Sequence, residues 1–381
     1  MCPCMIGYCT VVFSDPIFQP YMPELIKLFF ISCVVHQVCM LVFSPLRFAI
    51  GQVQDAGLIF LSAMATSIVR QLREQGVAVE DSIATVIVHL SLSSALVGVM
   101  LILTGRFKFA SIVHYLPMPV IGGYLAFIGV FTFQAGLSLM TTLHLTGIPS
   151  WIQLFDRTAL LHVSPGIVCG CLLLWVSKRF SHFAILPTCL ISMPLLFYGV
   201  CYFSSVSLDD ARSLGWVGKM SAEAPFWESW KMFDMSRVHW HVMLSQFPTW
   251  FSMYLVIAFS SSLDIAAIIM GTGTNLDYNE ELQTVGKCNF FSGITGGFTG
   301  SYIFSQTLFT FRTRAHSRIV GASLVVCESL IVMLPVSVVS NLPLFFFGSV
   351  MVFIGVDLMS TWLVRIYEKV CDRVWRQVDD R

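Results

Sequence analysis

Long apolar runs with at most one charged side chain recur from one end of this 381-residue chain to the other. A helix needs about 20 largely apolar residues to cross the roughly 30 Å hydrocarbon core of a bilayer. Lipid offers no partner to free backbone groups, so most such runs must be helices. The runs lie at 28–46, 50–69, 82–105, 116–140, 160–177, 183–206, 244–270, 286–298, 301–311, 319–340 and 343–364. The sequence therefore predicts an all-α polytopic membrane protein with about 11–12 membrane segments, two of them too short to span alone.

The composition excludes several other classes of protein. Hydrophobic residues make up 56% of the chain and charged residues 12%, and 32 residues are Phe, so a water-soluble domain could not cover its surface. The lipid bilayer is the expected solvent. The formal net charge is zero and no basic stripe exists outside short loop clusters, so nucleic acid is not an expected partner.

Cysteine usage indicates neither a disulfide framework nor a metal site. The chain has 12 cysteines, mostly inside apolar runs, where a thiol behaves as a small hydrophobic group. Cys2 and Cys4 form a single C-P-C without the second pair that a zinc site requires. We expect no metal and no cofactor.

The remaining charges predict which side of the membrane each loop occupies. Basic residues follow every second predicted span, which places that side in the cytosol by the positive-inside rule. They are Arg106, Lys108, Lys178, Arg179, Lys287, Arg312, Arg314, Arg318, Arg365, Lys369, Arg373 and Arg376. The long loop at 207–240 is then outside or lumenal, although Arg70 and Arg73 fall on that side too. Residues 1–364 are predicted to form one transporter-like membrane domain, and residues 365–381 a short basic cytosolic tail.

Two segments depart from the uniform apolar pattern, and they occupy comparable positions in the two halves of the chain. Residues 44–61 contain Pro45 and Gly51 ahead of a helical stretch, and residues 293–311 contain Gly296, Gly297 and Gly300 ahead of another. Paired, interrupted helices of this kind are typical of inverted-repeat transporters, in which they meet at the middle of the membrane. The alternative is that the glycines only permit close helix packing.

Such a pair of broken helices favours an anion as the bound solute. The first N–H groups of a helix lack partners within it, and the helix dipole places positive charge at that end. Two N-termini facing one gap would stabilise a negative solute without a basic side chain, and glycine lets the backbone approach it closely.

Two stretches of the chain carry motifs of a known family. The stretch from Leu263 to Thr307 contains an acid-bearing helix, an N-x-E-L turn, a G-x-x-N helix, a G-G pair and an S-x-T-like end. This order of motifs resembles the signature of the sulfate permease (SulP) family. The stretch Tyr115–Val130, Y-L-P-M-P-V-I-G-G-Y-L-A-F-I-G-V, resembles that family's P-x-P-V-I-G-G-F helix. The segment S-S-S-L-D-I-A-A is most similar to the corresponding segment of fungal and protist vacuolar members. The likeness covers nearly all of the chain.

The resemblance implies a fold of seven plus seven helices in two inverted repeats, divided into a core that holds the solute and a gate. The segments at 50–69 and 301–311 would be the third and tenth helices, and the chain would end after the twelfth. The first helix would survive only as about Met5–Phe13, and the cytosolic STAS domain would be missing. This predicts a fragment truncated at both ends. Relatives commonly pair, so a homodimer is also expected.

Family site residues can be transferred to individual positions. Ile50, Gly51, Gln52 and Val53 match the x-G-P-x turn of the third helix, with Gln52 in place of the usual proline. In the tenth helix the resemblance implicates Gly300, Ser301, Phe304, Ser305, Gln306 and Thr307. Some relatives carry a basic residue where Gln306 stands, and its loss is expected to weaken sulfate or chloride binding or to favour another solute.

The coupling group is expected on the eighth helix. Relatives often carry a glutamate there, and Ser260 occupies its position, with Asp264 one helical turn further on. A carboxylate inside a membrane helix is costly and usually faces a polar cavity, so we expect Asp264 to couple transport to protons or cations. Asp55, Glu328 and Asp357 are weaker candidates of the same kind, and His36, His89 and His114 could relay protons.

The sequence thus predicts a secondary transporter of inorganic anions, such as sulfate, chloride or bicarbonate, by proton symport or anion exchange. One alternative is a vacuolar carrier of another small solute, such as a basic amino acid. A second is a truncated remnant that does not transport. An enzyme is not expected, because no H-E-x-x-H or G-x-S-x-G motif occurs. Plasma and vacuolar membranes are both compatible with the sequence.

Overall fold

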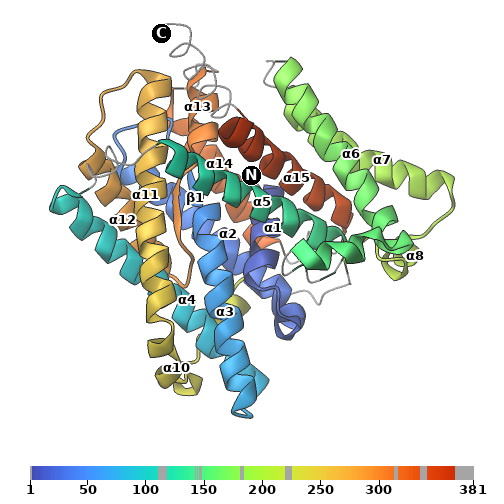
Figure 1. The fold of residues 1–381 in the computed structure, drawn as a ribbon, viewed down its shortest axis with the longest axis horizontal. Helices are drawn as coiled ribbons and strands as arrows, with labels where there is room; N and C mark the ends of the chain where they lie inside the picture. The colour runs from blue at the N-terminus through green and yellow to red at the C-terminus, as the bar shows by residue number, and fades with distance from the viewer. Residues whose placement is uncertain are drawn as a thin grey trace, which may run out of the picture.

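The computed structural model consists almost entirely of helices and describes residues 2–109, 118–141, 143, 145, 148–180, 184–218, 225–312, 316–334 and 341–364 (Figure 1). The predicted tail at 365–381 and His114 lie outside these residues. The long helices of the first half are α1 (Cys2–Val12), α2 (Met22–Phe43), α3 (Asp55–Glu74), α4 (Val79–Arg106), α5 (Met118–Thr141), α6 (Arg157–Arg179) and α7 (Ile185–Phe203). Those of the second half are α11 (Phe247–Thr272), α12 (Tyr278–Ile294), α13 (Phe304–Arg312), α14 (Arg318–Met333) and α15 (Leu344–Met359).

The all-helical, multi-pass architecture predicted from the apolar runs is confirmed. In the described part of the chain, five helices are long and apolar enough to cross a membrane, by length and composition. They are Pro16–Phe43, Val79–Arg106, Arg157–Arg179, Ile185–Phe203 and Phe247–Ile269. The predicted start at 286 was wrong, because α12 begins at Tyr278 with a polar first turn, where the side chain of Asp277 accepts a hydrogen bond from the N–H of Asn279.

Two short strands replace helix at the interrupted segments. Residues Gly51–Val53 form β1 and residues Gly300–Tyr302 form β2. The helix predicted over 50–69 therefore begins only at Asp55, and the one predicted over 301–311 begins only at Phe304. Extended backbone at both positions brings two distant parts of the chain within hydrogen-bonding reach of each other.

Small residues allow the long helices to pack closely. A Cβ atom at Gly98 of α4 would lie 2.4 Å from the backbone nitrogen of Phe290, and one at Gly293 of α12 would lie 2.3 Å from the nitrogen of Ala95. Gly129 of α5 and Gly355 of α15 form a similar crossing, with the Cβ of each 2.7–2.8 Å from the other's carbonyl oxygen. Such contacts are how helices associate where the solvent is as apolar as their side chains.

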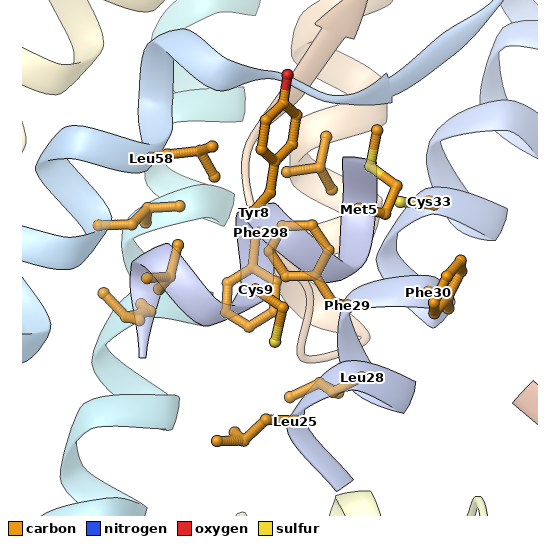
Figure 2. Close-up of a cluster of buried hydrophobic side chains, with 14 of the residues drawn as sticks. Met5, Tyr8, Cys9, Leu25, Leu28, Phe29, Phe30, Cys33, Leu58 and Phe298 are labelled. Atoms are coloured by element: carbon orange, nitrogen blue, oxygen red, sulfur yellow. The ribbon is translucent and has the colours of Figure 1, made fainter. Parts of the chain in front are cut away.

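An aromatic and aliphatic cluster fixes the approach to β2. Phe298, two residues before the strand, stacks on Phe29 of α2 with the ring centroids 5.2 Å apart. It also meets Phe13 edge-on at 5.8 Å. Figure 2 shows α1 and α2 contributing Met5, Cys9, Leu25 and Leu28 around this ring. Burial of these rings positions the second interrupted segment against the first helices of the chain.

The loop at 207–240 folds into short helices on the side where α3 ends. The structure describes α8 (Leu208–Ser213), α9 (Glu228–Lys231) and a 3-10 turn at Met235–Arg237, followed by α10 (Trp240–Ser245). Gln71 of α3 and Gln75, which follows that helix, bond to Ser245 and His241. These contacts place Arg70 and Arg73 on the side of this loop, as the sequence suggested. Arg73 there pairs with Asp15 at 3.0 Å. The cytosolic assignment of the opposite side stays a prediction.

Candidate functional site

The two interrupted segments cross as an antiparallel pair. Gly51 lies opposite Tyr302, Gln52 opposite Ser301, and Val53 opposite Gly300. The same register continues beyond the strands, because the N–H of Ile303 donates to the Ile50 carbonyl at 2.9 Å and that of Gln54 donates to the Thr299 carbonyl at 3.3 Å. From this crossing α3 and α13 run toward opposite edges of the molecule (Figure 1). The N-termini of both helices therefore meet at one place.

Side chains from α2 and α12 hold the backbone of the crossing. Gln37 of α2 accepts from the N–H of Gly51 at 3.0 Å and donates to the Ala49 carbonyl at 3.1 Å. Asn289 of α12 accepts from the N–H of Gly300 at 3.0 Å and donates to its carbonyl at 2.7 Å. These amide side chains satisfy polar backbone groups that would otherwise lie unpaired in a buried position. They also fix where each strand lies.

Several backbone N–H groups that the sequence led us to expect free are instead paired within the protein. The N–H of Ile50 donates to Thr307 Oγ1 at 3.2 Å, and the N–H of Ala56 donates to the carboxylate of Asp55 at 2.9 Å. Asp55 is the first residue of α3, so a carboxylate of the chain already occupies the positive end of that helix. The N-terminus of α3 thus carries a negative charge of its own, and an anion bound between the two helix N-termini stays a prediction.

The predicted coupling residues lie directly at the crossing. Gln54, which links β1 to α3, donates its side-chain amide to Ser260 Oγ at 2.6 Å and to Asp264 Oδ2 at 2.8 Å. Both acceptors belong to α11. Asp264 therefore reaches the first interrupted segment through one side chain.

Asp357 and two histidines that the sequence also singled out have different surroundings. Asp357 of α15 lies 4.0 Å from the amine of Lys178, and each side chain is about half exposed, at 48% and 49%. His36 hydrogen-bonds through Nε2 to the Phe298 carbonyl at 2.9 Å, and His89 contacts Ser93 of its own helix at 3.4 Å. Asp357 therefore contacts α6, and His89 contacts a residue of its own helix, α4. His36 holds the backbone that leads into β2.

A carboxyl group of α14 reaches the crossing, although the sequence marked it only as an isolated acid. Gln52 donates from Nε2 to Glu328 Oε2 at 3.3 Å, and both side chains are fully buried. A second buried acid at the crossing is Glu281 of α12, which accepts a hydrogen bond from the hydroxyl of Tyr302 in β2. Sequence patterns could not reveal these contacts, because the partners are 276 and 21 residues apart and meet only through helix packing.

The crossing has a buried side and a more open side. The buried side contains Gln52, Val53, Gly300, Ser301 and Thr307. Ile50, Gly51 and Ser260 are buried as well. Asp55, Asp264, Phe304 and Gln306 are partly exposed, and for Ser305 the structure describes only the backbone. All twelve residues of the predicted site belong to the two crossing segments or to the facing turn of α11.

Six polar atoms around the crossing are buried without a hydrogen-bond partner. They are Gln52 Oε1, Gln54 Oε1, Ser261 Oγ, Thr299 Oγ1, Ser301 Oγ and Glu328 Oε1. Buried polar atoms normally find a partner, so each of these calls for a ligand, a water molecule or a proton. The three carbonyl and carboxyl oxygens can only accept unless the carboxyl group carries a proton.

Solved transporter structures share this fold. The transmembrane domain of the cyanobacterial bicarbonate transporter BicA superposes with a TM-score of 0.66 at 15% identity, over 94% of this chain and 88% of that one. Murine Slc26a9, described as an anion transporter in the inward-facing state, gives a TM-score of 0.65 at 14% identity, over 99% of this chain and 60% of that one.

Sequence comparison gives a relative and a family. The vacuolar basic amino acid transporter VSB1 of Saccharomyces cerevisiae is 24% identical over 374 residues, which is 96% of this chain. The chain spans 36% of the length of that relative. The model of the sulfate permease family matches residues 3–369. The chain is thus an integral, multi-pass membrane protein that belongs to the sulfate permease family.

Proposed function

We propose that this chain forms the solute-carrying membrane domain of a secondary transporter for small inorganic anions. The observation that carries the proposal is the antiparallel crossing of β1 and β2, from which α3 and α13 depart with both N-termini at one buried site. Discontinuous helices of this arrangement bind solutes in inverted-repeat transporters. Membership of the sulfate permease family and the fold shared with a bicarbonate transporter support the same class of solute.

The anion would bind at the first turn of α13. This helix has no acidic residue in its first turn, whereas α3 begins with Asp55. Phe304 and Gln306 are partly exposed there, so a solute could reach the N–H groups of the turn. Ser301 Oγ in β2 and Thr299 Oγ1, just before that strand, are both unpaired and would supply hydroxyl donors.

Asp264 and Asp55 would take up the coupling proton. Both carboxyl groups are partly exposed at the open side of the crossing, and the ion pairs of the described residues involve other acids. Two neighbouring carboxylates beside a bound anion would repel it, so binding an anion and binding protons are expected to reinforce each other. This predicts proton symport.

A second candidate is a carrier of a basic amino acid. It is favoured by the same acids, because Asp55, Asp264 and the unpaired Gln54 Oε1 would accept hydrogen bonds from an ammonium or guanidinium group. The carboxylate of the amino acid would then bind at the first turn of α13. The similarity to a vacuolar basic amino acid transporter supports this candidate.

Uptake into proteoliposomes distinguishes the two candidates. Vesicles containing the chain would be loaded at pH 7 or pH 8 and diluted into labelled sulfate, chloride, bicarbonate or arginine at pH 6. Saturable, gradient-dependent uptake of one of the three anions supports the first candidate, and uptake of arginine alone supports the second. If none of the four solutes enters faster than into empty vesicles, both candidates are wrong. The expected homodimer would be checked separately, by the mass of the detergent-solubilised protein.

A further inference from the structure

Glu328 of α14 and Gln52 of β1 meet in a fully buried position. The exposed fraction of each side chain is 0%. Gln52 Nε2 donates to Glu328 Oε2 at 3.3 Å. The remaining oxygen of each group, Gln52 Oε1 and Glu328 Oε1, is buried without a partner. The hydrogen bond therefore uses only one oxygen of the carboxyl group. Gln52 Oε1 and Glu328 Oε1 are left as acceptors without a donor.

A carboxylate cannot satisfy this arrangement, whereas a carboxylic acid can. An ionised carboxyl group has no hydrogen to donate, so Gln52 Oε1 and Glu328 Oε1 would remain two unpaired acceptors in a buried site. A proton on Glu328 Oε1 can be donated to Gln52 Oε1, while Gln52 Nε2 continues to donate to Glu328 Oε2. Amide and acid then form a closed ring of two hydrogen bonds, and the buried charge disappears.

Glu328 takes part in none of the ion pairs formed by the described residues. The long helix in contact with α14 is α2, whose titratable side chains are Glu24, Lys27, Cys33, His36 and Cys39. Glu24 and Lys27 lie in its first two turns, and His36 is bonded to the Phe298 carbonyl. Beyond β1 the next titratable residue is Asp55, another acid. A proton on Glu328 would neutralise this buried carboxylate without any basic side chain.

The packing of α14 holds the two groups in register. Gly321 lies about two helical turns before Glu328, and a Cβ atom there would stand 2.5 Å from Nε2 of Gln37. Gln37 in turn bonds the backbone on both sides of Ile50, at Ala49 and Gly51. The segment entering β1 is thus held by Gln37, and the strand itself by Gln52 and Glu328.

We propose that Glu328 is a proton-carrying positioning residue, whose neutral carboxyl group forms a ring of two hydrogen bonds with Gln52 and thereby fixes β1 in the crossing. Loss of the proton to solvent leaves a carboxylate facing an amide oxygen and releases the strand. The proposal concerns a fully buried carboxyl group other than the proposed coupling residue Asp264. It holds whichever solute the proposed transporter carries.

Infrared spectroscopy of the purified chain tests the protonation directly and without any transport. The neutral acid has a C=O stretching band that an ionised carboxylate lacks. We expect this band to lose intensity in Glu328→Gln, in which two amides can form the same ring, and to be unchanged in Asp357→Asn, which removes a half-exposed membrane acid beside Lys178. A wild-type spectrum that does not differ from that of Glu328→Gln overturns the proposal.

A second variant covers the case in which Glu328→Gln does not fold. Gln52→Met removes the amide but keeps the length of the side chain, so the acid loses both hydrogen bonds and its band is expected to move to higher frequency. Thermal unfolding gives a further check, since the neutral ring stabilises the fold only while Glu328 is protonated. We expect the melting temperature of the wild type to fall as the pH rises from about 4.3, the ordinary pKa of a glutamic acid, toward neutrality, and that of Glu328→Gln to fall less. An unmoved band in Gln52→Met and parallel pH profiles of the melting temperature would each contradict the proposal.

Discussion

The side-chain amide of Gln54 donates a hydrogen bond to Asp264 at 2.8 Å, which joins the first interrupted segment to a membrane acid 210 residues away. The same nitrogen lies 2.6 Å from Ser260 Oγ, so a change at Asp264 acts directly on the residue that precedes α3. This link gives the proposed coupling a structural route. Protonation of Asp264 would alter how strongly Gln54 is held, and with it the start of α3.

The Asp264→Asn variant is therefore expected to uncouple uptake from the proton gradient. An asparagine can still accept a hydrogen bond from Gln54 but cannot take up a proton. We expect exchange of labelled solute across the membrane to continue, while uptake driven by an inward proton gradient falls to the level measured without a gradient. Asp357→Asn is the matched control and should retain gradient-driven uptake. Unchanged pH dependence in Asp264→Asn would exclude Asp264 as the coupling group.

A basic side chain at position 306 is expected to change the preferred solute. Gln306 lies in the first turn of α13 and is partly exposed at the open side of the crossing. A guanidinium there would form charge-assisted hydrogen bonds with an anion, of about 1.5–3 kcal/mol each. Gln306→Arg should lower the KM for sulfate by roughly tenfold or more and raise that for arginine, as measured by concentration-dependent uptake. An equal change in the KM values for sulfate and for arginine would show that the solute does not bind beside residue 306.

The Gly300→Ala substitution is expected to disrupt the crossing itself. A Cβ atom at Gly300 would stand 2.4 Å from the Gln52 carbonyl oxygen and 2.7 Å from Nε2 of His36. Overpacking of this kind costs about 1–3 kcal/mol. Gly199→Ala in α7 is the matched control, because nothing lies within 4 Å of its added methyl group, and there a helical alanine should stabilise by about 0.5–1 kcal/mol. Melting temperatures in detergent should move in opposite directions.

Asn289 is expected to be essential for the position of β2. Replacing it by Ala leaves the buried N–H and carbonyl of Gly300 without their partners, and each unsatisfied group costs about 1–3 kcal/mol. Asn275→Ala, at an exposed position in the loop between α11 and α12, should change stability little. A melting temperature for Asn289→Ala equal to that for Asn275→Ala would show that the clamp on Gly300 does not stabilise the fold.

The comparison of sequence and structure is most informative at the two interrupted segments. Gly51 and Gly300 marked both of them, because glycine and proline in an apolar run are local signals. The sequence could not show that residues 51–53 and 300–302 pair as strands, since a three-residue strand has too few positions to display a period. It also misplaced the start of α3, where residues 51–53 form a strand, and that of α12, where polar residues extend the helix ahead of the apolar run.

The sequence by itself determined that the protein is a multi-pass helical membrane protein with two broken helices and an acid in the span at 244–270, because these features follow from hydrophobicity, from glycine and from the cost of charge in lipid. Only the tertiary structure decided which polar groups meet. That Asn289 holds Gly300 and that Glu328 faces Gln52 depend on packing between helices. Such pairings are set by close approach at glycines far apart in the chain, and no local pattern of residues records them.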